Sequence, residues 1–444
     1  METKRELTGS NQPIVLKFIN IIMIGYAVMS VLRLIMFDLV LRSGYQDYTI
    51  TDWLINYQAG FVRRGLLGEL LFHISSLSDL SPKSLIIIVS TISFTAVCTI
   101  IIRKFRDLNL NWWILPLNVC LAGADFLRKD YLCFLFIIAV ILSFTKIEKT
   151  AFRVTIINIL LILLLNFHEA VFFIICPFVA LAFWRDSRIK LHSCVRPFLL
   201  IPVLITFYTL SLFKGDATIA QTIHNSWNIE EMGSQPAATI LSLSWDLPYA
   251  VAFHIKENFF SCSYYGKIEK PLLWLLTLLV IPNILFSRKS ISHTSSLNFF
   301  RVLIFQFISL FPMLTVLSCD QSRIFFYWTI SSICIYIHIP EKKLAEIFPE
   351  WTDPITERIR SFCTSSWAKC CALPLLFVIC ISPFSTKPKM AFFYSVTGSY
   401  TTVIATVMDV APSLKQVKSP AAITSLVKQE LMPALLKRLR SSEN

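Results

Sequence analysis

The sequence contains few charged residues, and the best-known motifs of nucleotide and metal chemistry are missing. Only 16% of its 444 residues are charged, against about a quarter in an average soluble domain. There is no GxxxxGK[ST] loop and no Asp-x-Asp motif, which argues against a nucleotide-driven pump and a nucleotide-sugar enzyme. The twelve cysteines form no CxxC pair, and HEAVF (168–172) lacks the second histidine of a metalloprotease helix. The sequence therefore implies no metal ion and no cofactor.

Long apolar runs make up much of the chain. Hydrophobic residues account for 55% of it, the mean hydropathy is +0.63, and the runs are about as long as a bilayer crossing requires. The net charge of +13 comes mainly from short basic clusters between these runs, a pattern typical of cytoplasmic loops and not of nucleic-acid binding. We expect an all-α, polytopic integral membrane protein with about 10–12 transmembrane helices. Its N-terminus, next to Lys4, Arg5 and Lys17, would lie in the cytoplasm.

The charge pattern also predicts how the chain is divided. Residues 1–386 are expected to form the transmembrane domain, starting with a span at about 18–40. The C-terminal segment, 387–444, contains an apolar run at 391–410, for which crossing is left open, and ends in a basic amphipathic helix at 421–440. The remaining predicted segments are a first outer loop (41–81), a second outer loop (214–270) and a cytoplasmic loop (341–370).

Two helical hairpins are predicted in the first half of the chain, at 112–144 and 156–183. Each begins and ends beside a basic cluster and has polar residues at its middle, so each tip should reach the outer side. Each limb has only about a dozen apolar residues, fewer than a bilayer requires. We therefore expect the tips to lie below the membrane surface, lining a cavity enclosed by protein.

The segment from Asp47 to His73 organises the rest of the chain. A charge at mid-bilayer costs roughly 2.5–3.5 kcal/mol, so charged side chains among apolar helices indicate function by default. The pair Arg63-Arg64 is expected on the outer side, where the positive-inside trend does not explain it. Three neighbouring glycines would let backbone amides approach an anion closely. These glycines are Gly60, Gly65 and Gly68.

Three further polar groups are predicted at the same outer side. Any one of them is explained equally well as a loop with satisfied ion pairs, but four groups on one face favour a shared site. The first group comprises Asp47, Asp52, Arg63, Arg64 and Glu69. The others are Asp125, Arg128, Lys129 and Asp130; then His168 and Glu169; then Asp320 and Arg323.

These residue types suit the transfer of a group from a diphosphate. Guanidinium groups bind phosphate oxygens through two parallel hydrogen bonds and stay charged where water is scarce. A nearby carboxylate can accept the proton of an attacking hydroxyl, and Asp52 is the first candidate base, with Glu169 second. The predicted substrate-binding residues are Arg63, Arg64, Glu69, Arg128, Lys129, Asp130, His168, Asp320 and Arg323. For His168, a buried structural histidine remains the alternative.

The order of these motifs resembles a known group of proteins. GFVRRGLLGE (60–69), then RKD (128–130), His168 and the pair Asp320 and Arg323 resemble bacterial envelope proteins from surface-polysaccharide loci. More distantly, the chain is similar to exopolysaccharide and O-antigen polymerases related to type C glycosyltransferases. That resemblance implies a polyprenyl-linked sugar donor and an acidic residue in the first outer loop. The Asp-Glu dyad of some type C transferases is absent.

The sequence thus predicts a membrane glycosyltransferase or polysaccharide polymerase. Its partners would be a lipid-linked glycan, membrane lipids and other polysaccharide-assembly proteins, and no nucleic acid. Two alternatives remain: a transporter or flippase of the same lipid-linked glycan, and a non-catalytic subunit of an envelope assembly. The resemblance also implies a location in a bacterial inner membrane.

Overall fold

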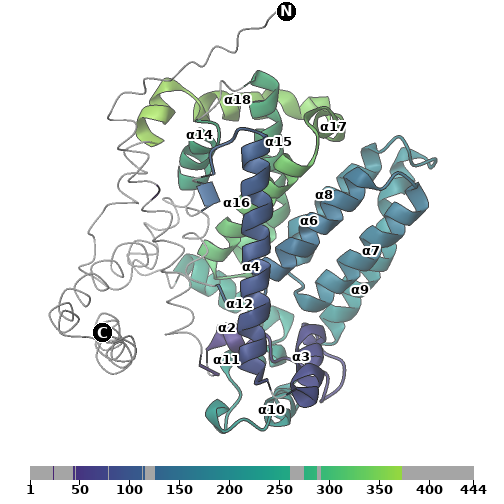
Figure 1. Cartoon of the computed structure of the whole chain (residues 1–444), viewed down its shortest axis with the longest axis vertical. Coiled ribbons are helices and arrows are strands. Elements are labelled where there is room, and N and C mark those ends of the chain that lie inside the picture. Colours follow the sequence, from purple (N-terminus) through teal and green to yellow (C-terminus); the bar gives the residue numbers. More distant parts are fainter. Residues whose placement is uncertain are drawn as a thin grey trace, which may run out of the picture.

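The described part of the chain is helical, and no strand occurs in it. The structure is a computed structural model, shown in Figure 1. It describes residues 24, 44–45, 47–78, 80–112, 114–115, 126–260, 275–287 and 292–372. The all-α prediction is therefore confirmed for these residues.

Within the described residues, four helical segments are long and apolar enough to cross a membrane, which indicates a membrane protein. They are α4 (Pro82–Asp107), α7 (Thr150–Phe167), the pair η1 (Ser193–Leu200) and α9 (Ile201–Leu212), and α15 (His293–Pro312) with η6 (Met313–Leu317). The total of ten to twelve spans stays a prediction. The expected spans at 18–40, 112–123 and 373–382 lie wholly or largely outside the described residues, as do the run 391–410 and the basic helix 421–440.

The described part of the two predicted hairpins consists of three helices, because most of the limb at 112–123 lies outside the described residues. Helices α6 (Asp130–Lys146) and α8 (Val171–Arg185) flank α7 in the chain, and α6 packs against α7. At 1.5 Å per residue, α6 is about 26 Å long and α8 about 22 Å, both shorter than the ~30 Å hydrocarbon core. Figure 1 shows α6, α7, α8 and α9 as a group inclined to the long helix α4. Their turns therefore bring polar residues to one level of the bundle.

Helix α16 (Gln321–His338) lies in the middle of the bundle. It packs against α4, α6, α8 and α15. The indole Nε1 of Trp328 on α16 donates a 2.6 Å hydrogen bond to the Leu303 carbonyl on α15. Pro312 ends the regular part of α15, because a proline donates no backbone hydrogen bond, and the π turn η6 follows. The chain then reverses into α16 at Asp320, which places Asp320 and Arg323 at the start of a central helix.

Short helices cover both ends of the bundle (Figure 1). Beside the lower end of α4 lie α2 (Tyr48–Thr51), α3 (Gly65–Leu77), α10 (Ala217–Ser226), η2 (Glu230–Met232), α11 (Ala238–Leu241) and η3 (Ser242–Ser244). The second loop continues through α12 (Leu247–Ile255) and the π helix η4 (Lys256–Phe260). At the upper end lie α14 (Ile281–Leu285), which follows the π helix η5 (Leu276–Val280), α17 (Glu341–Ile347), and α18 (Asp353–Cys363), which follows η7 (Glu350–Thr352).

Candidate functional site

The first outer loop is held by indole hydrogen bonds to backbone carbonyls. Trp53 Nε1 donates to the Leu127 carbonyl at 2.6 Å, and Trp227 Nε1 donates to the Leu54 carbonyl at 2.7 Å. Both indoles are buried, so these bonds are shielded from water. The first bond places the residue before Trp53, Asp52, beside the start of α6. The bond from Trp227 ties the first outer loop to the second outer loop.

Asp52 is a buried carboxylate between two cations. Its Oδ2 atom lies 3.5 Å from Lys129 Nζ, and its Oδ1 atom lies 3.6 Å from Arg64 Nη1. Burial raises the pKa of Asp52, but the charges of Lys129 and Arg64 outweigh that effect and hold the pKa well below its usual value. Among the described residues, no donor is within hydrogen-bonding distance of Asp52 Oδ1. That oxygen is buried, so a substrate hydroxyl could reach it only after the neighbouring side chains move.

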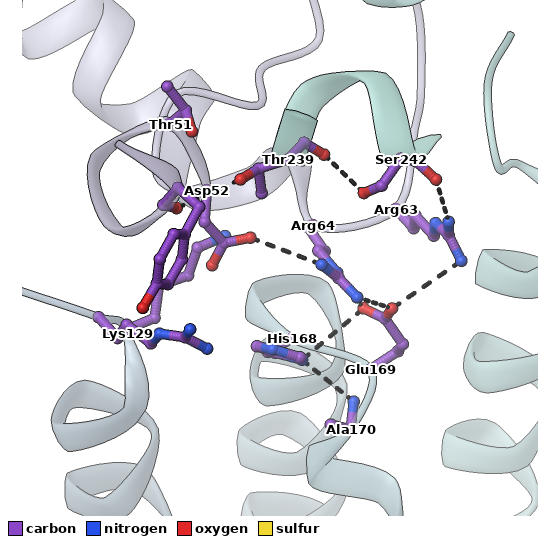
Figure 2. A network of polar contacts seen from close by, with 12 residues as sticks. Thr51, Asp52, Arg63, Arg64, Lys129, His168, Glu169, Ala170, Thr239 and Ser242 are labelled. Carbon is purple, nitrogen blue, oxygen red and sulfur yellow. Dashed lines mark hydrogen bonds and ion pairs between the residues drawn. The ribbon is translucent and has the colours of Figure 1, made fainter. Parts of the chain in front are cut away.

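Arg64 joins the two candidate bases. Its backbone is in the left-handed region, with φ of +65°. Its guanidinium donates two hydrogen bonds to the Glu169 carboxylate (Figure 2). One of them, from Nε to Oε2, measures 2.7 Å. This bidentate geometry is the one with which arginine binds planar anions. Burial raises the pKa of Glu169, yet Arg64 outweighs it and keeps the carboxyl ionised.

Arg63 has no carboxylate of its own. Its Nη2 donates to the Ser242 carbonyl at 3.0 Å, while its Nη1 lies 4.0 Å from the Glu169 oxygen that Arg64 already binds. In the described part of the structure its Nε meets no acceptor, although the atom is buried. About a quarter of the side chain, 24%, remains exposed, so Arg63 can still be reached from solvent.

His168 is a neutral imidazole enclosed by donors. Arg323 Nη2 lies 3.1 Å from its Nε2, and the Ala170 amide lies 3.2 Å from its Nδ1. Burial lowers the pKa of His168 to about 3, and the nearby positive charges of Arg64 and Arg323 act in the same direction. A neutral imidazole has one acceptor nitrogen, so His168 accepts either from Arg323 at Nε2 or from the Ala170 amide at Nδ1, and not from both.

A further ion pair joins α6 and α16. Arg323 forms two hydrogen bonds to Asp130, at 2.9 and 2.6 Å, and the Tyr327 hydroxyl donates a third at 2.6 Å. Beside this pair, Arg128 Nη1 lies 3.2 Å from Asp320 Oδ2, and its guanidinium stacks 4.4 Å from the Tyr48 ring centre.

Residues predicted from four distant parts of the chain therefore meet at one end of the bundle. We call them the polar network: Asp52, Arg63, Arg64, Lys129, Asp130, His168, Glu169 and Arg323, flanked by the pair Arg128 and Asp320. Their cations exceed their carboxylates by one charge, with His168 neutral. Arg63 is the cation left over, because the other four each have a carboxylate within 3.6 Å.

Two predicted residues are placed differently. Glu69 accepts hydrogen bonds from the Tyr57 amide at 2.8 Å and from Gln58 Nε2 at 3.0 Å, and lies 2.9 Å from His73, so its contacts brace the loop. Asp47 caps α2 by accepting the Thr49 amide. Asp125 lies outside the described residues.

The glycines have a packing role that the sequence did not suggest. A Cβ at Gly68 would lie 1.8 Å from the Ile55 carbonyl oxygen, and one at Gly65 would lie 2.2 Å from the Tyr57 ring. Protein therefore fills the space beside both glycines, where the sequence had suggested an anion. Gly60, with φ of +100°, has open space around it and provides the loop's sharp turn.

Tyr327 and Ser242 were missed by sequence analysis. Tyr327 follows Arg323 by four residues, so helical spacing could have placed it on the same face. The Ser242 carbonyl has no such signal, because any residue could offer a backbone oxygen from the second outer loop.

The network offers cations for an anion and carboxylates for a proton or a hydroxyl. The side chains of Arg63, Arg64 and Glu169 are 21–24% exposed and that of the flanking Asp320 is 35% exposed, whereas Lys129 is fully buried. Among the described residues no three His, Cys, Asp or Glu side chains lie close enough to hold a metal ion. Comparison of the chain with protein families, curated proteins and solved structures finds no match.

Proposed function

We propose that the protein is a membrane glycosyltransferase of the polysaccharide-polymerase type. Its substrate would be a glycan linked to a polyprenyl diphosphate, at the outer face of the bacterial inner membrane. The observation that carries this proposal is the excess cation, Arg63, at the accessible side of a buried network that also holds carboxylates. A diphosphate supplies the negative charge that this site lacks, and a carboxylate supplies the base that sugar transfer needs.

The arginines would bind the diphosphate. Arg63 reaches it first, since its nearest carboxylate, Glu169, lies 4.0 Å away and is already bound by Arg64. Arg64 then exchanges Glu169 for a phosphate, since both anions accept the same pair of parallel hydrogen bonds. The two guanidiniums stabilise the charge that develops on the leaving diphosphate.

Binding of the diphosphate also activates the base. With Arg64 drawn toward the phosphates, Asp52 keeps only Lys129 as a close cation, and its pKa rises. Asp52 then takes the proton of an acceptor sugar hydroxyl while that oxygen attacks the anomeric carbon. The bond from that carbon to the diphosphate oxygen breaks, and polyprenyl diphosphate leaves with the electron pair.

One observation favours a second candidate, a flippase of the same lipid-linked glycan. Each carboxylate of the network lies beside a cation, and the low pKa of Asp52 makes it a weak base until Arg64 moves. A protein that only carries the glycan needs charge complementarity and no base. Asp52 would then serve to position Arg64 and Lys129.

The two candidates are separated in sealed vesicles that contain the purified protein and a lipid-linked donor. A polymerase lengthens the glycan and releases polyprenyl diphosphate in step with each bond formed. A flippase moves intact donor between leaflets and releases none. Lengthened glycan without movement of donor is the expected result, and movement without release would overturn the polymerase.

A further inference from the structure

Helix α17 and one end of α8 lie at the end of the bundle opposite α2 and α3 (Figure 1), and a second cluster of charges lies between them. A cavity of about 410 Å³ opens there between the C-terminal end of α8 and helix α17. Four cations line it: Arg185, Arg188, Lys342 and Lys343. An adjoining cavity of about 1110 Å³ shares Arg185 and Lys342.

Two carboxylate residues, Asp186 and Glu346, line this cavity against four cations. Asp186 is taken by two arginines, with Arg153 Nη2 at 2.7 Å and Arg188 Nε at 2.9 Å. In the described part of the structure, Arg185, Lys342 and Lys343 have no carboxylate within ion-pair distance.

The cations use neutral oxygens instead. Arg185 Nε donates to the Glu346 backbone carbonyl at 3.2 Å, and Lys343 Nζ donates to the Phe144 carbonyl at 3.1 Å. Burial lowers the pKa of Lys343 to about 8, and the charge of Arg188 adds to that effect. A bound anion would relieve this repulsion.

The cavity also lies where the apolar helices end. Helix α7 begins at Thr150 and α8 ends at Arg185, and both limits belong to this end of the bundle. Beside Arg185, Trp184 lines the larger cavity and is 37% exposed. Further along η1, Val195 and Phe198 are 48% and 61% exposed. Exposed tryptophan above exposed aliphatic and aromatic side chains is typical of the level of lipid headgroups.

We propose that this cavity binds the phosphate of an anionic phospholipid from the adjacent leaflet. The phosphate lies between Arg185, Lys342 and Lys343, and the acyl chains lie against the exposed face of η1. A free phosphate ion would satisfy the cations but would gain nothing from that apolar face. The proposal does not depend on the reaction at the other end of the bundle.

Native mass spectrometry of the full chain in detergent tests this site. The protein is titrated with phosphatidylglycerol, with phosphatidylcholine of the same acyl chains, and with inorganic phosphate. We expect phosphatidylglycerol to bind at least about tenfold more tightly than phosphatidylcholine. Lys342→Gln and Lys343→Gln should each weaken that binding about fivefold, the scale of one basic residue near a membrane surface.

Arg106→Gln is the matched control, because Arg106 is an exposed basic residue at the same end, on α4, away from the cavity. It should leave phosphatidylglycerol binding unchanged. Lys342 is exposed, so its substitution should not disturb folding, and an unchanged melting temperature would verify this. Equal binding of the two lipids, an equal loss in Arg106→Gln, or displacement of lipid by stoichiometric inorganic phosphate would each overturn the proposal.

Discussion

Arg64 connects carboxylates from two separate parts of the fold. Its guanidinium binds Glu169 at the junction of α7 and α8, and its Nη1 lies 3.6 Å from Asp52 in the first outer loop. The left-handed backbone at Arg64 costs about 1–2 kcal/mol for a residue with a side chain. Asparagine or glycine would adopt this conformation at a lower cost. The side-chain contacts of Arg64 with Glu169 and Asp52 offset the cost here. Selection for the guanidinium itself explains an arginine there.

Replacing Arg64 with lysine keeps the positive charge and removes the planar pair of hydrogen-bond donors that binds an anion through two parallel bonds. Because lysine offers a point charge, Arg64→Lys should weaken donor binding by about tenfold or more, measured by titration of the purified protein with a lipid-linked diphosphate. Arg103→Lys, an exposed change at the other end of α4, is the control and should bind as the wild type does. Equal affinity in both variants would contradict a bidentate contact.

His168 makes the stability of the protein depend on pH. Its pKa is about 3 in the folded protein against 6.5 when unperturbed, so below about pH 6.5 the unfolded chain binds a proton that the folded chain does not. Stability should therefore fall as the pH is lowered from about 7.5 to about 5, and rise again when the pH is restored. His168→Gln should show a smaller fall in melting temperature over that interval. The exposed His192→Gln should keep the wild-type slope, and equal slopes in all three proteins would contradict a buried neutral His168.

At the scale of elements, helix positions follow from the sequence, and contacts between loops do not. The apolar runs predicted at 132–144 and 156–165 lie within α6 and α7. Their boundaries extend by a few residues because helix termini include polar residues such as Asp130. The predicted polar groups also gathered at one end, since hairpins of similar length must turn at similar depth.

What the sequence could not show is how the two outer loops pack. Trp227 and Ser242 contact the first outer loop from more than 170 residues away. No periodicity relates segments at that separation. Glu69 illustrates the same limit: the sequence placed it with the substrate-binding residues, and packing of α3 directs its carboxylate to Tyr57 and Gln58. Short-range patterns predict where a helix forms and not which loop its polar side chains will contact.

Gly68 tests the packing of α3 against the first outer loop. In Gly68→Ala the new methyl would lie 1.8 Å from the Ile55 carbonyl oxygen, so α3 or the loop must move. We expect a loss of about 1–3 kcal/mol in stability, seen as a lower melting temperature. Gly44→Ala is the control, because no atom lies within 4 Å of its added methyl. Equal melting temperatures for the two variants would show that α3 does not depend on that contact.

At the scale of the whole molecule, the two ends of the bundle carry different charge arrangements. The polar network pairs nearly every cation with a carboxylate, whereas the cavity beside Lys343 leaves several cations without one. Ions buried among apolar helices must be neutralised locally, while cations at a headgroup level can meet lipid phosphates. This difference fits a membrane protein whose polar network is a site and whose opposite end meets the lipid surface.

The proposed orientation predicts from which side of the membrane a cysteine at each end of the bundle can be labelled. In a cysteine-free background, Glu231→Cys in the second outer loop should react with a membrane-impermeant maleimide added to intact cells. Ser187→Cys should react only after the membrane is opened. Both residues are exposed in the structure, so a failure to react reports the membrane and not burial. Labelling of both from outside would contradict the hairpin topology and the outer-face assignment of the network.

The most direct test of the central claim compares donor binding with product formation in Asp52→Asn. The substitution keeps the shape of the side chain and removes its charge and basicity. Purified protein in nanodiscs is supplied with lipid-linked donor and acceptor, and bound donor and lengthened glycan are measured separately. If Asp52 takes the acceptor proton, turnover falls by about 10²–10⁴ while donor affinity stays within a few-fold of wild type. Wild-type turnover in Asp52→Asn would contradict the proposed mechanism.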